Sequence, residues 1–404
     1  MKKWYIPVVL ALTTFVHYLD RNTLALALPQ IAHEQNWTNA ELGLYGEYLL
    51  GSFYVSFGLF QIFLSKYAER WSIKSSLLLS IIFFSLTTFL FYPYGYSLAA
   101  LVGLRFLLGA GESLHMPMNS AIIAHTFPPH ARGRANSIYV AGILLALMLS
   151  PVLLIPLIEK IGWRLTFAVL GAGGLFLCMP LVIRYIPSIP SPKKRGPSTL
   201  SPLREGRLRW YLLAGSANAF CIFGMLNWLP SYLHRSRGIP FDELSLPLLC
   251  IFGAGIVGLM LWAWIGDRRK NRLALARGGL LLSGVCVLLT EMPVSDILIM
   301  GLLTAGVFFQ STYNAQEFAT LQSFYPSSQV GAVTGLYNGL TVLVGGVGGS
   351  FIPGAFVAAT GSFQAGLMSI AFGAFLVALA LHVLLRRLSR EPKEQFSRKA
   401  PLQG

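Results

Sequence analysis

The sequence predicts an all-α polytopic membrane protein in which twelve transmembrane helices form two pseudo-symmetric six-helix bundles. Of the 404 residues, 54% are hydrophobic and 12% are charged, and the mean hydropathy is +0.61. These values lie outside the usual range of soluble globular domains. Apolar segments recur along the whole chain, and features of its first half return in the second. Together these observations predict a duplicated membrane fold.

The apolar segments define the expected helices, because each is close to the roughly 20 residues that cross a bilayer. Lys2 and Lys3 precede the first segment as they would in a signal peptide. Asp20 and Arg21 interrupt that segment, however, and the apolar run continues after them, so we expect a retained first helix. The expected helices span residues 4–30, 41–65, 74–92, 98–124, 134–158, 164–186, 209–234, 244–265, 273–291, 296–321, 331–358 and 363–387.

The distribution of lysine and arginine predicts the orientation, since cytoplasmic loops collect basic residues. If the tails and even-numbered loops are cytoplasmic, they hold all but six of the 31 basic residues. We therefore expect both termini in the cytoplasm, and the short loops favour a bacterial inner (plasma) membrane. Topology also explains the net charge of +15 better than a nucleic-acid partner does, because the basic residues cluster between apolar segments.

A polar segment rich in Pro, Ser, Lys and Arg separates six expected helices from six. We expect an N-terminal bundle over 1–186, a cytoplasmic linker over 187–208, a C-terminal bundle over 209–387 and a basic cytoplasmic tail over 388–404. Acid–base clusters after the second and eighth helices lie 198 residues apart, which indicates duplication around a binding site between the bundles. The repeated residues are Glu69, Arg70 and Lys74, then Asp267, Arg268 and Arg272.

The stretch from Leu104 to Asn119 carries charges inside an apolar segment. Arg105 and Glu112 are seven residues apart, so both fall on one face of a helix, and Asn119 continues that stripe. Each such charge costs about 3 kcal/mol in the hydrocarbon core and normally marks an ion or substrate path. We expect the stripe to face the protein interior or a wet cavity.

The tenth expected helix carries a second polar face at i, i+3, i+4 and i+7. We expect this face to line the cavity between the bundles. The alternative is polar packing between helices, and the last residue of the face, Glu317, could instead belong to an inner gate. Tyr48, beside Glu47, could line the outer half of the cavity or sit in a wet vestibule, and Asn338 is a further candidate contact. The glycines from Gly345 to Gly349 are expected to allow close helix approach. The four residues of the polar face are Gln310, Tyr313, Asn314 and Glu317.

Several motifs together resemble one family of membrane proteins. The chain resembles a transporter of the major facilitator superfamily, and within it the anion:cation symporter family of hexuronate and galactonate transporters, sialin and vesicular glutamate transporters. The resemblance covers essentially the whole chain and implies a monomer that works by alternating access. Its motifs are Tyr18-Leu19-Asp20-Arg21, the series Arg105, Gly109, Glu112 and Pro117, and Asn227-Trp228-Leu229-Pro230.

The resemblance implies that Arg21 binds the carboxylate of the substrate, for which a guanidinium fork is well matched. Asp20 and Glu112 are the candidate proton carriers, because a carboxylate that loses its arginine to a substrate anion tends to take up a proton. Arg105 is then their counter-ion. Two static alternatives are an Arg21–Asp20 pair and an Arg105–Glu112 clamp.

Three further features complete this interpretation. The repeated acid–base clusters resemble the cytoplasmic latch of the superfamily, so we expect them to gate the inner side. His17 and His115 either shuttle protons or are hydrogen-bonded core residues. Ile143 and Leu144 stand where sugar-acid transporters of this family often have a polar residue, which makes a strongly hydroxylated substrate less expected.

The sequence thus predicts a secondary active transporter that couples a small organic anion, such as a sugar acid or another carboxylate, to protons by symport. The alternatives are an exporter or anion exchanger for a dicarboxylate, a siderophore-like metabolite or a drug, and a non-transporting membrane sensor. We see no nucleotide-binding motif, metal-ligand spacing or nucleophile–base pair in the sequence, so we expect no cofactor, bound metal or enzyme activity.

Overall fold

A computed structural model describes residues 3–68, 72–189, 206–268, 271–292, 294–324 and 327–390. Helices make up nearly all of this described part, and it contains no strand. The helices are α1 (Tyr5–Glu34), α2 (Asn39–Ala68), α3 (Ile73–Tyr94), α4 (Leu98–Glu112), α5 (His115–Thr126), α6 (Pro129–Ile161), α7 (Trp163–Gly173), the π-helix η1 (Gly174–Cys178), α8 (Met179–Tyr185), α9 (Gly206–Arg235), the 3-10 helix η3 (Asp242–Leu244), α10 (Ser245–Arg268), α11 (Arg272–Leu289), α12 (Asp296–Ser323), α13 (Ser327–Thr360) and α14 (Phe363–Arg390).

These helices combine into twelve long segments, because α4 continues as α5 and α7 continues through η1 as α8. Among the described residues, ten of the twelve are long and apolar enough to cross a membrane. Of the other two, α1 carries Asp20 and Arg21 near its middle, and α2 carries Glu47 in its first third. The predicted all-α membrane fold is therefore confirmed.

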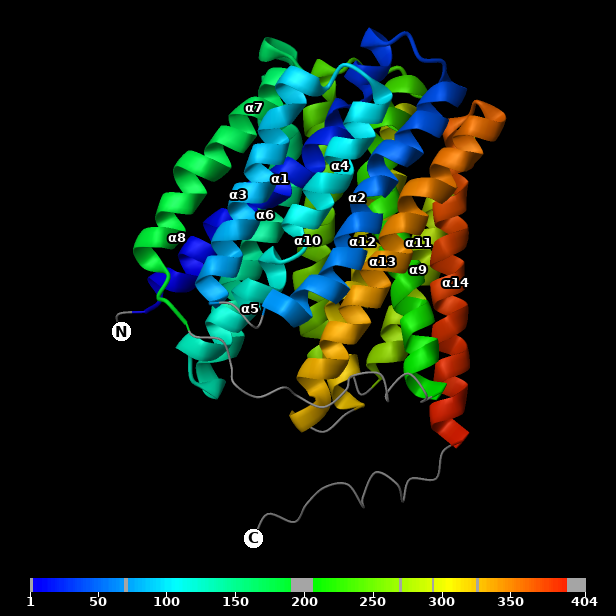
Figure 1. The fold of residues 1–404 in the computed structure, drawn as a ribbon. Coiled ribbons are helices and arrows are strands. Elements are labelled where there is room, and N and C mark those ends of the chain that lie inside the picture. Colours follow the sequence, from blue (N-terminus) through cyan, green and yellow to red (C-terminus); the bar gives the residue numbers. More distant parts are fainter. Residues whose placement is uncertain are drawn as a thin grey trace.

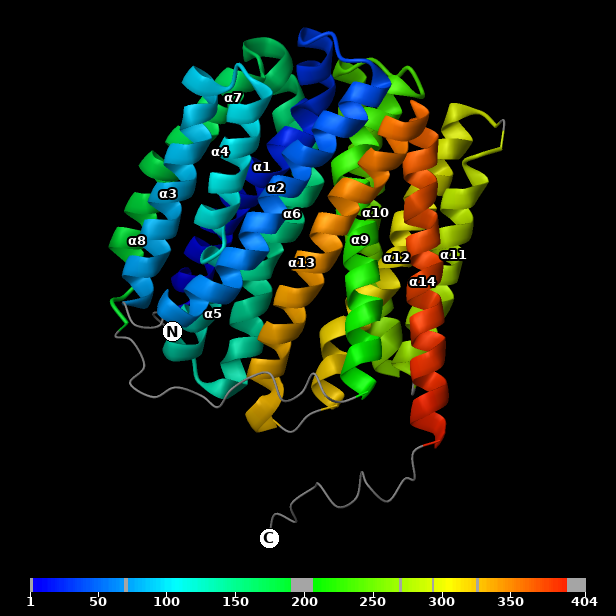
Figure 2. The ribbon, with the colours of Figure 1, turned by 45° about the vertical axis from the view of Figure 1, so that its right-hand side comes forward.

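The helices pack as two groups, which we call the N-terminal bundle (α1–α8) and the C-terminal bundle (α9–α14). The groups lie side by side and meet mainly through α2 with α13, α6 with α10, and α1 with α9 (Figures 1 and 2). The start of α1 and the end of α14 lie at the same end of the molecule (Figure 1). A chain that crosses a membrane an even number of times begins and ends on the same side, as these two helix ends do.

Glycines bring the two bundles into close contact near the start of α2. A Cβ atom on Gly43 would lie 2.4 Å from the backbone nitrogen of Ala358 in α13, and one on Gly46 would lie 2.9 Å from the Trp228 ring of α9. Toward the other end of the seam, a Cβ on Gly339 would lie 4.0 Å from Ile62. Between these ends, Cβ atoms on Gly51 and Gly58 of α2 would lie 2.0 Å from the Phe351 ring and 2.4 Å from the Leu343 side chain of α13, so α2 and α13 pack closely from Gly43 to Gly58 and less closely at Gly339.

The glycines from Gly345 to Gly349 pack α13 against α9, as predicted. A Cβ on Gly345 would lie 2.5 Å from the carbonyl oxygen of Ser216, and one on Gly349 would lie 2.6 Å from that of Phe220. Side chains at these positions would push the helices apart, so the prediction of close approach is confirmed.

Candidate functional site

The fourth membrane segment is broken directly after Glu112. α4 ends at Glu112 and α5 begins at His115, with a two-residue turn between them. Pro117 has no N–H to donate to the carbonyl four residues earlier, which lies in this turn. The membrane segment predicted over 98–124 is nevertheless one span, Leu98–Thr126. The stripe survives the break, because Arg105, Glu112 and Asn119 are all buried.

Arg21 of α1 and Glu112 of α4 form the central ion pair. The Nη2 and Nε atoms of Arg21 donate to Glu112 Oε2 at 3.0 and 3.1 Å, and the two side chains are 5% and 0% exposed. The guanidinium lies 4.9 and 4.7 Å from the ring centres of Phe53 and Phe57 in α2, which adds cation–π attraction. Removal of one partner would strand a buried charge, at a cost of about 3–5 kcal/mol.

Both static pairings weighed from the sequence are wrong for the described residues. Asp20 does not bind Arg21 but accepts a hydrogen bond from Thr88 of α3. Consecutive helix residues point about 100° apart, so Asp20 and Arg21 face different neighbours. Arg105 does not bond to Glu112, since its Nη2 donates to the backbone oxygen of Arg21 at 3.4 Å.

Arg105 is a buried cation with unused donors. Its Nε and Nη1 atoms have no hydrogen-bond partner in the part of the chain that the structure describes, and its guanidinium lies 4.8 Å from the Phe53 ring centre. Arg105 is close enough to Asp20 and Glu112 for electrostatic attraction, although it makes no direct bond to either. Buried charged donors without partners cost about 1–3 kcal/mol or more, so an anion that supplied an acceptor here would be stabilised.

The polar face of α12 is bonded within the C-terminal bundle. Asn218 Nδ2 of α9 donates to Asn314 Oδ1 at 2.8 Å, and Gln310 Nε2 lies 3.5 Å from Asn218 Oδ1. Gln310 is buried, whereas Asn314 is half-buried. The amide of Gln310 therefore takes part in polar packing between helices, the alternative that the sequence left open, and substrate contact by this face stays a prediction.

Three tyrosines, joined by hydrogen bonds, lie around Glu317, which is farther along the same face of α12. The hydroxyls of Tyr313 and Tyr337 are 2.8 Å apart, and Tyr337 donates to Glu317 Oε1 at 2.8 Å. Tyr211 of α9 donates to the backbone oxygen of Glu317 at 2.7 Å. Tyr313 is 1% exposed and bonds to Tyr337 of its own bundle, and its contact with substrate stays a prediction. Glu317 is half-buried and has no ion-pair partner among the described residues.

The two remaining predicted substrate contacts lie apart from these clusters. Tyr48 is 44% exposed, and its ring meets that of Phe351 in α13 edge-on at 6.0 Å. It is therefore not part of the buried polar cluster, and its predicted place in the outer half of the cavity or in a wet vestibule stays a prediction. Asn338 is half-buried, and its carbonyl accepts from Thr341 at 3.1 Å.

The described residues of the predicted gate make contacts within their own bundles. Lys74 Nζ donates to the carbonyl oxygen of Ile183 at 2.8 Å, and Arg268 lies over the Trp264 ring at 3.4 Å. Arg272 Nη1 donates to Gln316 Oε1 at 3.5 Å. Glu69, Arg70 and the side chain of Asp267 lie outside the described residues, so the gate stays a prediction.

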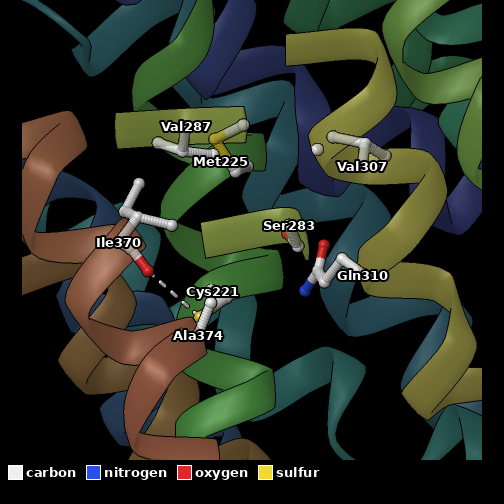
Figure 3. Close-up of a pocket in the computed structure, with 9 residues that line it drawn as sticks. Cys221, Met225, Ser283, Val287, Val307, Gln310, Ile370 and Ala374 are labelled. Carbon is white, nitrogen blue, oxygen red and sulfur yellow. Dashed lines mark hydrogen bonds between the residues drawn. The ribbon is translucent and has the colours of Figure 1, made fainter. Parts of the chain in front are cut away.

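A small cavity lies inside the C-terminal bundle, between α9, α11, α12 and α14 (Figure 3). Its volume is about 10 Å³, enough for about one water molecule. Cys221, Met225 and Ile370 line it, with Ser283 and Gln310 as polar members. This cavity is too small for an organic substrate and does not lie between the bundles.

Comparison with known proteins identifies the family. The sequence model of the Major Facilitator Superfamily matches residues 10–350. The chain belongs to the Major Facilitator Superfamily. It is a membrane transporter, not an enzyme.

Major facilitator transporters of known name align with nearly the full chain. A probable galactarate/D-glucarate transporter, GudP of Bacillus subtilis (strain 168), is 25% identical over 434 residues, which cover 96% of this chain and 93% of GudP. The D-galactonate transporter of Escherichia coli O6:H1 is 26% identical, with 96% and 97% covered. A probable sulfoacetate transporter, SauU of Cupriavidus necator, is 27% identical, with 88% and 87% covered.

The fold also matches a solved major facilitator structure. The crystal structure of a bacterial homologue of the human lysosomal transporter Spinster, inward-facing and occupied, superposes with a TM-score of 0.81. Identity is 16%, and the match covers 96% of this chain and 98% of that one. This likeness supports the fold.

Sequence reasoning missed the threonines that complete this major facilitator site. Thr88 bonds to Asp20, and Thr14 accepts from Asn119 at 3.0 Å. Threonine in an apolar helix commonly bonds to its own backbone, as Thr88 also does to Phe84. Its presence alone therefore gave no signal of a second role.

Proposed function

We propose that the chain is a secondary active transporter that carries a small organic anion together with protons by alternating access. The observation that carries this proposal is the buried Arg21–Glu112 pair beside the unused donors of Arg105. A guanidinium fork matches the geometry of a carboxylate, so a substrate carboxylate at Arg21 competes with Glu112 for the same cation.

Proton uptake follows from that competition. An ionised carboxylate that loses its cation in a buried site costs several kcal/mol, so binding a proton lowers the free energy. Glu112 is one candidate to receive this proton. Asp20 is the other, and its Oδ1 atom has no hydrogen-bond partner among the described residues. Substrate binding and proton binding are then linked, which is the requirement for symport.

The relatives support the substrate class. The proteins named above transport galactarate or D-glucarate, D-galactonate and sulfoacetate by their names, and all of these are organic anions. Ile143 and Leu144 are half-buried apolar residues of α6. They favour, as a rival, an exporter or exchanger of the same fold that moves a less hydroxylated anion.

Alternating access assigns roles to the larger parts of the chain. We infer that residues 1–186 and 209–387 move as units joined by the linker 187–208, and that the close seam at Gly43 represents the form closed on the outer side. The gate clusters would close the inner side in the opposite form. We place the protein as a monomer in a bacterial inner membrane, with both termini cytoplasmic.

A binding screen followed by transport tests this function. Purified protein, Arg21→Ala and the matched surface variant Arg237→Ala are heated with sugar acids, dicarboxylates and sulfonates, since a ligand at 100 times its Kd stabilises the folded state by about 2.7 kcal/mol. We expect one anion to stabilise the parent and Arg237→Ala but not Arg21→Ala. In proteoliposomes that anion should accumulate only with an inward proton gradient.

Two outcomes would contradict the proposal. Equal stabilisation of the parent and Arg21→Ala would remove Arg21 from the binding site. Accumulation that persists after the proton gradient has been collapsed would favour the exchanger.

A further inference from the structure

A ladder of buried polar side chains joins α1 to the broken segment α4–α5. Residues of α1 at helical spacing face residues of α4 and α5 at the same spacing, in opposite chain direction. Each rung is a short polar contact: Arg21 Nη2 to Glu112 Oε2 at 3.0 Å, His17 Nε2 to Glu112 Oε2 at 3.2 Å, His115 Nε2 to Thr14 Oγ1 at 3.4 Å, and Asn119 Nδ2 to Thr14 Oγ1 at 3.0 Å. None of the six side chains is more than 6% exposed.

The two histidines occupy the centre of this ladder. Their rings stack with centres 4.4 Å apart and planes inclined by 12°. The Nδ1 atoms of His17 and His115 are buried and have no hydrogen-bond partner among the described residues, and His17 Nε2, although 3.2 Å from Glu112 Oε2, makes no hydrogen bond to it in this arrangement. An apolar residue would fill this space without burying unpaired polar atoms, so packing alone does not account for two histidines here.

The ladder is followed by apolar residues at the next turn of each helix. Leu10, four residues before Thr14, and Ile122, three residues after Asn119, are both fully buried. Besides Glu112, the ionisable groups near the two histidines are Arg21 and Tyr18 of α1. From α3, the ring of Phe84 lies edge-on to both histidines. From α6, the Tyr139 hydroxyl donates to the Sδ atom of Met116, the residue after His115, at 3.5 Å.

His17 and Arg21 share one atom, Oε2 of Glu112. When Arg21 turns to a substrate carboxylate, Glu112 loses its cation, and the imidazole next to it can supply another by binding a proton at Nε2. We propose that the proton linked to substrate binding, for which Glu112 itself was one candidate, binds to His17, which then replaces Arg21 as the cation partner of Glu112 during transport. His115, stacked on His17, opposes a second positive charge beside the first, so the pair holds one proton.

This inference rests on the proposed function for its place in transport, but its test needs no substrate. Arg21→Gln removes the cation from Glu112 permanently. In protein labelled with ¹⁵N-histidine, we expect His17 to change from neutral imidazole to imidazolium at neutral pH in Arg21→Gln. Arg21→Lys is the matched control, because it keeps a positive charge and should leave His17 neutral. The chain has seven histidines, so His17→Gln in the same background assigns the signal.

Two spectroscopic results would overturn the proposal. One is a neutral His17 in Arg21→Gln together with a protonated-carboxyl infrared band that disappears when Glu112→Gln is added, since the proton would then reside on the carboxylate. The other is an imidazolium signal that survives His17→Gln. Neither result depends on finding the transported anion, so failure of this proposal and failure of the proposed function are distinguishable.

Transport then separates a proton-binding role from a structural one. His17→Gln places an amide near Glu112 that can donate a hydrogen bond but cannot carry charge. We expect uptake driven by a proton gradient to fall about 10-fold or more and to lose most of its dependence on pH. A purely structural residue would lower the rate and leave its pH dependence unchanged, and an unchanged driven uptake would also contradict the proposal.

Discussion

The interiors of the two bundles differ in charge at positions that correspond through the 198-residue repeat. At this offset Asp20 corresponds to Asn218 and Glu112 to Gln310, so each of these two buried acids is matched by an amide of similar shape. Arg105 corresponds to Leu303, which is fully buried. The same backbone plan therefore holds an ionic cluster in one half and neutral hydrogen bonds in the other.

This difference suggests that the two bundles have different roles in transport. Charged groups can exchange protons and bind an anion, whereas Asn218, Gln310 and Asn314 bond to one another without any change of charge. If the coupling chemistry is confined to α1, α4 and α5, neutral substitutions should be severe there and mild in α9 and α12. Each prediction below tests this asymmetry.

The largest effect is expected from Glu112→Gln, which gives the N-terminal bundle the residue of its counterpart. Arg21 would lose its carboxylate and remain a buried charge, at a cost of about 3–5 kcal/mol. We expect proton-driven uptake to fall by about 100-fold or more and thermal unfolding to occur at a lower temperature. As a reciprocal control, Gln310→Glu added to Glu112→Gln should not restore uptake. Near-normal driven uptake by Glu112→Gln alone would contradict a difference in role between the two bundles.

A smaller effect is expected from Asp20→Asn, which again copies the C-terminal residue. The amide oxygen can still accept from Thr88, so the helix contact is kept while the ionisable group is lost. We expect driven uptake to fall about 10-fold, with little change in unfolding temperature. Thr88→Val separates the two contributions, because it removes the hydrogen bond and leaves the acid in place.

How much of this site the sequence could predict depended on the distance between partners along the chain. Spacing within one segment placed Arg105, Glu112 and Asn119 on one buried stripe, and the structure agrees. Pairing between segments was not readable, because periodicity gives the face of a helix but not the neighbour opposite it. Arg21 and Glu112 are 91 positions apart, and their bond depends on how α1 packs beside α4.

The break after Glu112 shows a second limit. Apolar length predicted one membrane segment over 98–124, and Leu98–Thr126 is long and apolar enough to cross a membrane as one span. Pro117 was visible as a motif residue, but proline is tolerated inside many membrane helices. Only the packing shows that its missing N–H coincides with a turn between two helices.

The C-terminal counterpart of these tests is Glu317→Gln. The only described side chain that bonds to its carboxylate is Tyr337, at 2.8 Å, and a glutamine oxygen can accept the same bond. We therefore expect proton-driven uptake within about 3-fold of the parent. Tyr337→Phe is the matched variant that removes the donor. Loss of driven uptake in Glu317→Gln, with exchange retained, would place proton coupling in both bundles and end the division proposed here.

The smallest effects are expected at the rim, where the two bundles are alike. Glu34 pairs with Arg164 at 2.6 Å in the N-terminal bundle, and Asp296 pairs with Arg237 in the C-terminal bundle. The acids are 44% and 52% exposed, so Glu34→Gln and Asp296→Asn should each change the free energy of unfolding by about 0–1 kcal/mol.

Glu34 also gives that prediction a pH dependence. Partial burial opposes its ionisation, but hydrogen bonds from Arg164 and Trp163 outweigh this and hold the pKa of Glu34 below its ordinary value of 4.5. A lowered pKa means that the folded state favours the ionised form, so the stabilisation is present above pH 4.5 and is lost as the pH falls through the lowered pKa. Unfolding of the parent and Glu34→Gln should therefore differ slightly at pH 7 and converge on acidification. A difference that grew as the pH fell would show that Glu34 stabilises the fold in its protonated form.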